Sequence, residues 1–256
     1  MSRNSDVALA GLALLIAAAP GCTRRAPAKQ TMHVGHHVVR CVPPAGWEHL
    51  DHGLKQVFRR EEMELYLADL GPATREGMEC ELMAARRIAE AGRVLDAFER
   101  VRELEGPPLF LASWQQRAEF WRVWNGVVLY GDRAGTAAIE GGFESLFAGA
   151  ALLPPVTPDG MVAYALHRVT DTPRRELARK TRRAVGGREW IDVETWDRVT
   201  HLERRRLACV DDHGYLLVLG IERGPIVLTA PVYEALLGSI EIAADTTAIA
   251  QGSEPE

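Results

Sequence analysis

Residues 42–60 read VPPAGWEHLDHGLKQVFRR, a stretch in which extended chain is interrupted by a turn. The segment from His37 to Val42 predicts a first strand, and the run from Pro43 to Gly46 ends it because proline and glycine favour turns. Trp47 then begins another extended segment. The folded part of the chain is therefore expected to open with a strand, a turn and a second strand.

Extended and helical segments alternate in the residues that follow. Met63 to Leu70 alternates in polarity, as a strand does. Gly77 to Glu105 is the longest helical stretch, and Gly92 allows a bend within it. Apolar residues recur there at spacings of three and four, at Ala84, Ile88, Ala91, Leu95, Phe98 and Val101. One face of this helix is expected to pack in the core.

Two hairpins are predicted in the second half of the chain. Residues 117–130 hold the pair Asn125 and Gly126 between apolar arms, and such a pair accepts the positive φ values of a type I′ turn. The second hairpin runs from His201 to Glu222 through a turn at residues 211–214. A helix from Pro231 to Ser239 follows, with Thr229 in position to cap it.

The opening segment resembles the start of PsbP-like domains, a family that includes small bacterial lipoproteins. That family begins with a strand, a Pro/Gly-Trp turn and another strand, and it ends with a hairpin, a helix and a last strand, as residues 207–242 are expected to do. The resemblance implies an α+β fold, an antiparallel sheet packed with helices. It also implies a role in binding and assembly, with no catalytic residues to carry over.

Internal similarity suggests two related subdomains in tandem. The expected strand at Met63 is echoed by a second expected strand, MVAYALHRV, at Met161, and SWQQR at Ser113 is echoed by TWDRV at Thr195. Residues 37–153 and 161–243 are therefore expected as two PsbP-like subdomains, divided by the proline-rich stretch between them. Insertions are needed to align the halves, so a chance similarity stays open.

Composition limits the classes of protein to consider. The chain has 256 residues, of which 47% are hydrophobic and 25% charged, as in globular proteins that bury a core. Its net charge is −5, whereas a nucleic-acid binder needs an excess of Lys and Arg to displace counterions. No nucleic-acid partner is therefore expected.

The amino terminus carries the most specific motif. An uncharged apolar run from Val7 to Ala19 is shorter than the roughly 20 residues needed to span a bilayer, but it suits a secretory signal. The residues APGC at 19–22 resemble the lipobox of bacterial lipoproteins, although Pro20 departs from its usual pattern. The resemblance implies a signal peptide over 1–21 and acylation, including palmitate, at Cys22. A plain signal peptide cut near Ala19 and a buried helix are the alternatives.

The lipobox resemblance also implies a membrane location. The second mature residue is Thr23 and not the Asp that favours inner-membrane retention, so an outer-membrane anchor facing the periplasm is expected for a Gram-negative source, and the cell membrane surface otherwise. Several acyl chains hold more firmly than one. Residues 22–36 are expected to form a tether, and residues 244–256 a disordered acidic tail.

The remaining cysteines support no redox motif. Cys41, Cys80 and Cys209 include no C-x-x-C pair, and their number allows at most one disulfide. Free, buried thiols that pack as small apolar side chains are expected at all three positions.

One histidine cluster could hold a metal. Five of the eight histidines lie between residues 33 and 52, and a turn at Pro43 could bring His36 or His37 near His49 and His52. Imidazoles bind Zn²⁺ or Cu²⁺. Solvated polar side chains are the plainer interpretation, because neighbouring residues on a strand point to opposite faces.

Arginine and tryptophan residues provide candidate partner contacts. The basic run at residues 174–188, with Arg204, Arg205 and Arg206, could face anionic lipid or an acidic partner, or it could form a solvated helix face. Trp121 and Trp124 differ in parity on the predicted hairpin, so one could be core and the other could cover a partner or a ligand cleft.

Familiar catalytic motifs are absent from the sequence. It contains no G-x-S-x-G, P-loop, G-x-G-x-x-G or H-E-x-x-H motif, and the trio at residues 211–213 is typical of a turn. We therefore expect no enzyme and no cofactor. The expected function is that of a lipid-anchored envelope protein that binds or assembles with a protein partner. An apolar-ligand carrier, for example of lipid, and a metal-binding protein are the alternatives.

Overall fold

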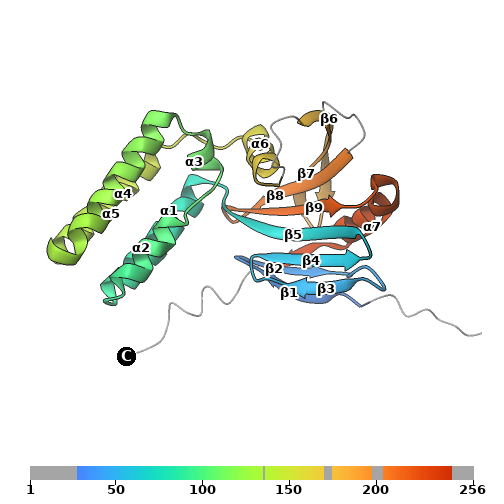
Figure 1. Cartoon of the computed structure of the whole chain (residues 1–256), viewed down its shortest axis with the longest axis horizontal. Helices are drawn as coiled ribbons and strands as arrows, with labels where there is room; N and C mark the ends of the chain where they lie inside the picture. Colours follow the sequence, from blue (N-terminus) through green and yellow to red (C-terminus); the bar gives the residue numbers. More distant parts are fainter. Residues whose placement is uncertain (1–27, 135, 170–174, 198–203, 244–256) are drawn as a thin grey trace, which may run out of the picture.

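The computed structural model describes residues 28–134, 136–169, 175–197 and 204–243 (Figure 1). Two antiparallel sheets lie together on one side, and a group of helices, which we call the helical arm, projects from them. The α+β class expected from the sequence is confirmed. The expected signal peptide, Cys22 and the expected acidic tail lie outside the described residues.

The larger sheet has the strand order β3-β4-β5-β9-β8-β7-β6. Its strands are β3 Glu48–Asp51, β4 Lys55–Arg60, β5 Met63–Pro72, β6 Arg175–Val185, β7 Arg188–Asp197, β8 Arg204–Asp212 and β9 Tyr215–Arg223. The smaller sheet has the order β1-β2-β10, from β1 Gln30–Val34, β2 His37–Cys41 and β10 Glu241–Ala243.

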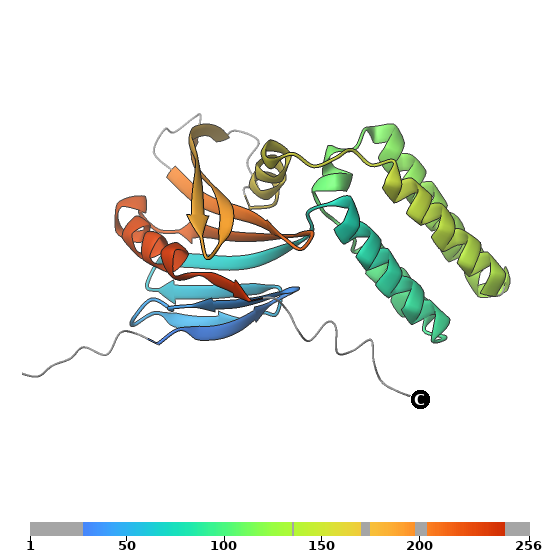
Figure 2. The ribbon, with the colours of Figure 1, turned by 180° about the vertical axis from the view of Figure 1, so that it is seen from behind.

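Alternating side chains give the larger sheet two buried faces. On β9, Leu217, Leu219 and Ile221 pack on one face against the smaller sheet and α7 (Ile226–Ser239), which lies across this face in Figure 2. Leu216 and Val218 point to the other face, where they pack with α6 (Pro158–Val169). This period of two is why β9 is apolar throughout its centre.

The helical arm has its own apolar core. It consists of α1 (Arg75–Glu90), α2 (Val94–Arg102), α3 (Pro107–Leu111), α4 (Trp114–Ala134) and α5 (Thr136–Ala151). Their buried side chains form one cluster that includes Leu82, Phe98, Phe120 and Leu146. Thr74 caps α1 by accepting a hydrogen bond from the Gly77 amide through its side chain.

The arm meets the sheet at an elbow where two backbone segments touch. Gly71 has φ +85°, and a Cβ there would lie 2.5 Å from the Glu105 carbonyl oxygen. A Cβ on Gly106 would lie 2.3 Å from the Pro72 carbonyl oxygen. Only glycine permits this approach, which fixes the return of the arm beside the end of β5.

Several sequence-based expectations agree with the structure. A turn at Pro44–Trp47 ends the opening strand, with the Trp47 amide donating to the Pro44 carbonyl and Gly46 at φ +76°. The extended segment after Trp47 is a hairpin of two strands, β3 and β4. The second hairpin forms from β8 and β9 around His213 and Gly214. The long helix is divided into α1 and α2 at Gly92, where φ is +79°.

Two expected extended segments are helices. The hairpin predicted at residues 117–130 is wrong, since Asn125 and Gly126 lie inside α4. The strand predicted from Met161 is also wrong, because that segment belongs to α6. Thr157 begins α6 by accepting the Gly160 amide on its hydroxyl, and Pro158 follows at the first helical position.

The basic run is an edge strand and not a helix face. Residues 175–185 form β6, which pairs with β7 alone in the larger sheet. Its described arginine and lysine side chains are largely exposed, as befits an edge that must not pair with another chain.

The expected division into tether and subdomains also changes. β1 lies within residues 22–36, where a tether was expected, and it pairs with β2 along five residue pairs. β5 pairs with β9, so ranges 37–153 and 161–243 contribute to one continuous sheet and are not separate subdomains. The last helix begins at Ile226, which places Thr229 inside it, where its hydroxyl donates to the Pro225 carbonyl.

The described cysteines are free, and one of them is not buried. Cys41 and Cys209 pack in the core as expected, whereas Cys80 on α1 is exposed. Within the described part of the chain, no helix is both long enough and apolar enough to cross a membrane.

Candidate functional site

The first candidate region joins the smaller sheet to α1 through His36. Its Nδ1 lies 2.7 Å from Oδ2 of Asp69 on β5, and its Nε2 lies 3.0 Å from Oε1 of Glu81 on α1. The Tyr215 hydroxyl donates to Glu81, and the Tyr215 ring stacks on that of His36 with centroids 3.8 Å apart. Arg100 of α2 also contacts Glu81, at 2.8 Å.

Both ring nitrogens of His36 face carboxylates, which favours the imidazolium form. Burial alone would lower the pKa of His36, but the hydrogen bonds to Asp69 and Glu81 outweigh it and raise that pKa from 6.5 to about 9. The same contacts lower the pKa values of the Asp69 and Glu81 carboxyls in spite of their burial. The ion pairs of His36 with Asp69 and Glu81 therefore connect the sheets to the arm, and we call them the His36 tie.

The four histidines proposed for metal are not brought together. His37 is buried, with Nδ1 3.4 Å from Oδ2 of Asp212, while His49 bonds to Gln56 and stacks on Phe58. His52 is exposed at the turn between β3 and β4. Among the described residues, no three His, Cys, Asp or Glu side chains are grouped as metal ligands. The described residues therefore contain no site that supports the metal-binding interpretation.

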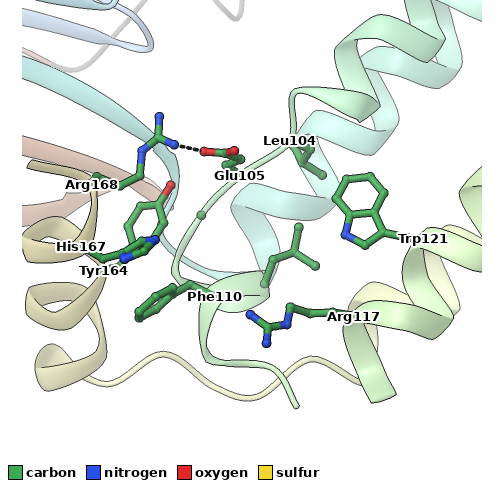
Figure 3. Close-up of a pocket in the computed structure, with 10 residues that line it drawn as sticks. Leu104, Glu105, Phe110, Arg117, Trp121, Tyr164, His167 and Arg168 are labelled. Carbon is green, nitrogen blue, oxygen red and sulfur yellow. Dashed lines mark hydrogen bonds and ion pairs between the residues drawn. The ribbon is translucent and has the colours of Figure 1, made fainter. Parts of the chain in front are cut away.

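The second candidate region is a hollow of about 240 Å³ at the elbow, drawn in Figure 3. Four segments line it: the α2–α3 connection, α3, α4 and α6. We call it the elbow hollow; its lining residues are Leu104, Glu105, Gly106, Leu109, Phe110, Arg117, Trp121, Tyr164, His167 and Arg168.

Charged and aromatic side chains both line the elbow hollow. Arg168 is ion-paired with Glu105. Phe110 packs against His167 and Tyr164, whose ring centroids are 5.0 and 5.6 Å away. Burial raises the pKa of Tyr164 to about 12, so its hydroxyl stays protonated and donates to the Leu70 carbonyl. These contacts hold the wall made by α3 and α6.

The opposite wall is made by Arg117 and Trp121, one turn apart on α4. In the part of the chain that the structure describes, the Arg117 guanidinium has no carboxylate within ion-pairing distance. Figure 3 shows it directed away from α4, with the indole nitrogen of Trp121 on the side facing the other labelled side chains. Both groups can donate hydrogen bonds to a ligand.

A second hollow of about 260 Å³ lies where the elbow meets the His36 tie. It shares Leu104 and Glu105 with the elbow hollow, and Asp69, Glu81 and Glu103 contribute to its lining. Its charged groups are mostly engaged with one another through His36 and Arg100. Of these two hollows, the elbow hollow is the one whose lining includes a cationic group, Arg117, that has no ion-pair partner in the described ranges.

The proposed partner-contact residues have different environments. Trp121 lines the elbow hollow, whereas Trp124 is only 4% exposed and packs edge-on against Phe98 in the arm core. Arg206 is held by Asp192 and Glu234, with 13% of its side chain exposed. Arg204 begins β8, and its side chain lies outside the described part of the chain.

Sequence reasoning missed the α6 side of the elbow hollow. Tyr164, His167 and Arg168 are spaced by three and four residues, which places them on one face of a helix. Interpreted as a strand, the same residues scatter over two faces. The Thr-Pro start at residues 157–158 was the available signal, because it is typical of a helix N-terminus.

Comparisons with solved structures find a likeness of fold. No protein-family model matches the chain, and no curated protein matches it. The solution structure of cyanobacterial PsbP (CyanoP) from Synechocystis sp. PCC 6803 matches 88% of this chain and 99% of its own, with 10% sequence identity and a TM-score of 0.40.

Proposed function

We propose that this protein is a lipid-anchored, periplasm-facing envelope component that binds or assembles with a protein partner and performs no catalysis. Acylation of Cys22 in the APGC motif would fasten it to the outer membrane of a Gram-negative source. A PsbP-like origin of the globular part belongs to the same proposal and rests on the strand, Pro-Ala-Gly-Trp turn and strand of residues 37–60.

The observation that carries the binding role is the elbow hollow. Its lining includes the Arg117 guanidinium, which has no ion-pair partner among the described residues, and the indole of Trp121, and aromatic rings pack along one wall. Arginine and tryptophan are enriched among the side chains that dominate binding energy at protein interfaces. The apolar-carrier alternative has less support, since charged side chains line both described hollows.

Replacing the anchor cysteine tests the membrane address. We expect Cys22→Ser to abolish incorporation of labelled palmitate and to shift the protein from the membrane fraction to the soluble fraction. Cys80→Ser is the matched control, because Cys80 is an exposed thiol of the folded part and its loss should leave both measurements unchanged. Mass spectrometry of the mature protein should find an acylated residue 22 at its start. An unmodified chain that starts elsewhere would refute the anchor.

Replacing the elbow tryptophan tests the binding role. We expect Trp121→Ala to reduce recovery of a specific envelope protein by at least about tenfold in affinity capture from solubilised membranes, as a loss of roughly 1.4 kcal/mol implies. Trp114→Ala is the matched control, since Trp114 lies on the same helix, is 70% exposed and is outside the elbow hollow. Equal recovery with both variants would contradict a binding role for the hollow.

A further inference from the structure

The elbow hollow has the charge balance of a site for one negative charge. Its lining carries two guanidinium groups, Arg117 and Arg168, and one carboxylate, Glu105. Glu105 is already paired with Arg168, so among the residues that the structure describes the positive charge without a carboxylate partner is that of Arg117. A single planar guanidinium matches a carboxylate through two parallel N–H···O bonds. A doubly charged phosphate would leave one charge without a partner here.

The rest of the lining suits an apolar group attached to that carboxylate. Leu104, Leu109 and the rings of Phe110 and Trp121 border the same space, and Phe110 is held by contacts with Tyr164 and His167. Trp121 adds one N–H donor beside Arg117. An anionic end and an apolar body would thus be accommodated side by side.

We propose that the elbow hollow binds the carboxyl-terminal residue of a polypeptide whose last side chain is apolar. This inference rests on the proposed function, because it names the part of the protein partner that the site recognises. Arg117 takes the terminal carboxylate as a bidentate partner, Trp121 donates to it through its indole N–H, and the last side chain packs against Phe110 and Leu109.

A lipid surface fits the hollow less well. The hollow is concave and is bordered by four chain segments, so it suits one chain end better than a plane of headgroups. A free fatty acid shares the carboxylate and the apolar body, and it therefore enters the experiment as a separate arm.

The test measures binding of peptide pools to the full chain purified in detergent. The two pools are acetylated tetrapeptides that end in Leu or Phe, one with a free carboxyl terminus and one amidated. We expect the acid pool to bind at least about tenfold more tightly than the amide pool, because only the acid pool presents a carboxylate to the Arg117 guanidinium. The acid pool should also shift the indole N–H nuclear magnetic resonance signal of Trp121, assigned by its loss in Trp121→Phe.

Matched variants distinguish binding at the elbow hollow from nonspecific attraction to positive charge. Arg117→Gln should reduce the affinity for the acid pool about tenfold and leave the affinity for the amide pool unchanged. Arg122→Gln on the same helix should change neither, because Arg122 is exposed, paired with Glu119 and outside the hollow. Circular dichroism and the thermal midpoint of each variant check that the fold is kept.

Three results would overturn the inference. The first is equal affinity for the acid and the amide pools. The second is an affinity for the acid pool that Arg117→Gln does not reduce. The third is binding of octanoate or of phosphatidylglycerol vesicles that depends on Arg117, while the acid pool does not bind. The proposed function would survive any of these if Trp121→Ala still reduced partner capture. It would fail if partner capture were unaffected by that variant.

Discussion

In urea unfolding at pH 6, His36→Gln is expected to lower the free energy of unfolding by about 2 kcal/mol, the lower part of the range for hydrogen bonds to charged groups. The lower part applies because 36% of the His36 side chain is exposed and water screens the charges. The substitution removes the cation that faces Asp69 and Glu81 and leaves both carboxylates with fewer partners.

The effect should depend on pH with a definite sign. The pKa of His36 rises from 6.5 to about 9 in the folded protein, so the folded state holds this proton more tightly than the unfolded state does. The stabilisation is therefore fully present below pH 6.5 and is lost as the pH rises through about 9. Near pH 10 the variant and the parent protein should unfold at closer urea concentrations than at pH 6.

His52→Gln is the matched control for this series. His52 is exposed at the turn between β3 and β4, and its replacement should leave both stability and its pH dependence unchanged. Urea midpoints measured for the three proteins at pH 6, 8 and 10 decide the matter. A constant difference between His36→Gln and the parent over this range would show that His36 is not held as an imidazolium.

His36 also shows how far sequence reasoning reached. The grouping of histidines in residues 33–52 marked the right part of the chain, but their partners lie far away in sequence, at Asp69 and Glu81. Only the pairing of strands and the placement of α1 bring these carboxylates to His36. The sequence showed where histidines gather, whereas the groups that they contact depend on tertiary structure.

Local turn signals failed where packing was stronger. Asn125 and Gly126 are typical of a hairpin, yet Phe120 and Trp124, four residues apart, are both buried in the arm core. That spacing is helical, and packing against α5 outweighs the turn preference of the pair. Strands with clear alternation and punctuation, such as β5 and the β8–β9 hairpin, were predicted because local pattern and tertiary environment agree there.

Sequence reasoning also could not tell a free arginine from a structural one. Arg204, Arg206 and Arg117 look alike in the sequence, but only the fold shows that Arg117 lines a hollow and that Arg206 is fixed in an ion pair. The difference arises from neighbours on other strands and on α7.

Asp192→Asn is expected to lower the free energy of unfolding by about 3 kcal/mol, the low end of the loss seen when one partner of a buried ion pair is removed. The Asp192 carboxylate is 2% exposed and accepts hydrogen bonds from Arg206, from Arg183 at 3.2 Å and from the Tyr233 hydroxyl at 3.2 Å. These contacts tie α7 to β6, β7 and β8. Glu234 also contacts both arginines, which keeps the loss at the low end.

The pair Glu189 and Arg182 provides the control on the neighbouring turn. Both side chains are exposed, and Glu189→Gln should change stability by less than about 1 kcal/mol. Urea unfolding of both variants at pH 7 measures the difference. Asparagine keeps the shape of aspartate, so a large loss would report the charge and not a cavity.

Arg206→Met then distinguishes a structural arginine from a partner contact. Because Arg206 lies over the Tyr233 ring, 4.7 Å from its centroid, and pairs with Asp192, we expect this variant to destabilise the fold by an amount similar to Asp192→Asn. Partner capture by the fraction that remains folded should be unchanged. Unaltered stability together with lost capture would instead assign Arg206 to the binding surface, and the ionic network around Asp192 would then not hold α7 in place.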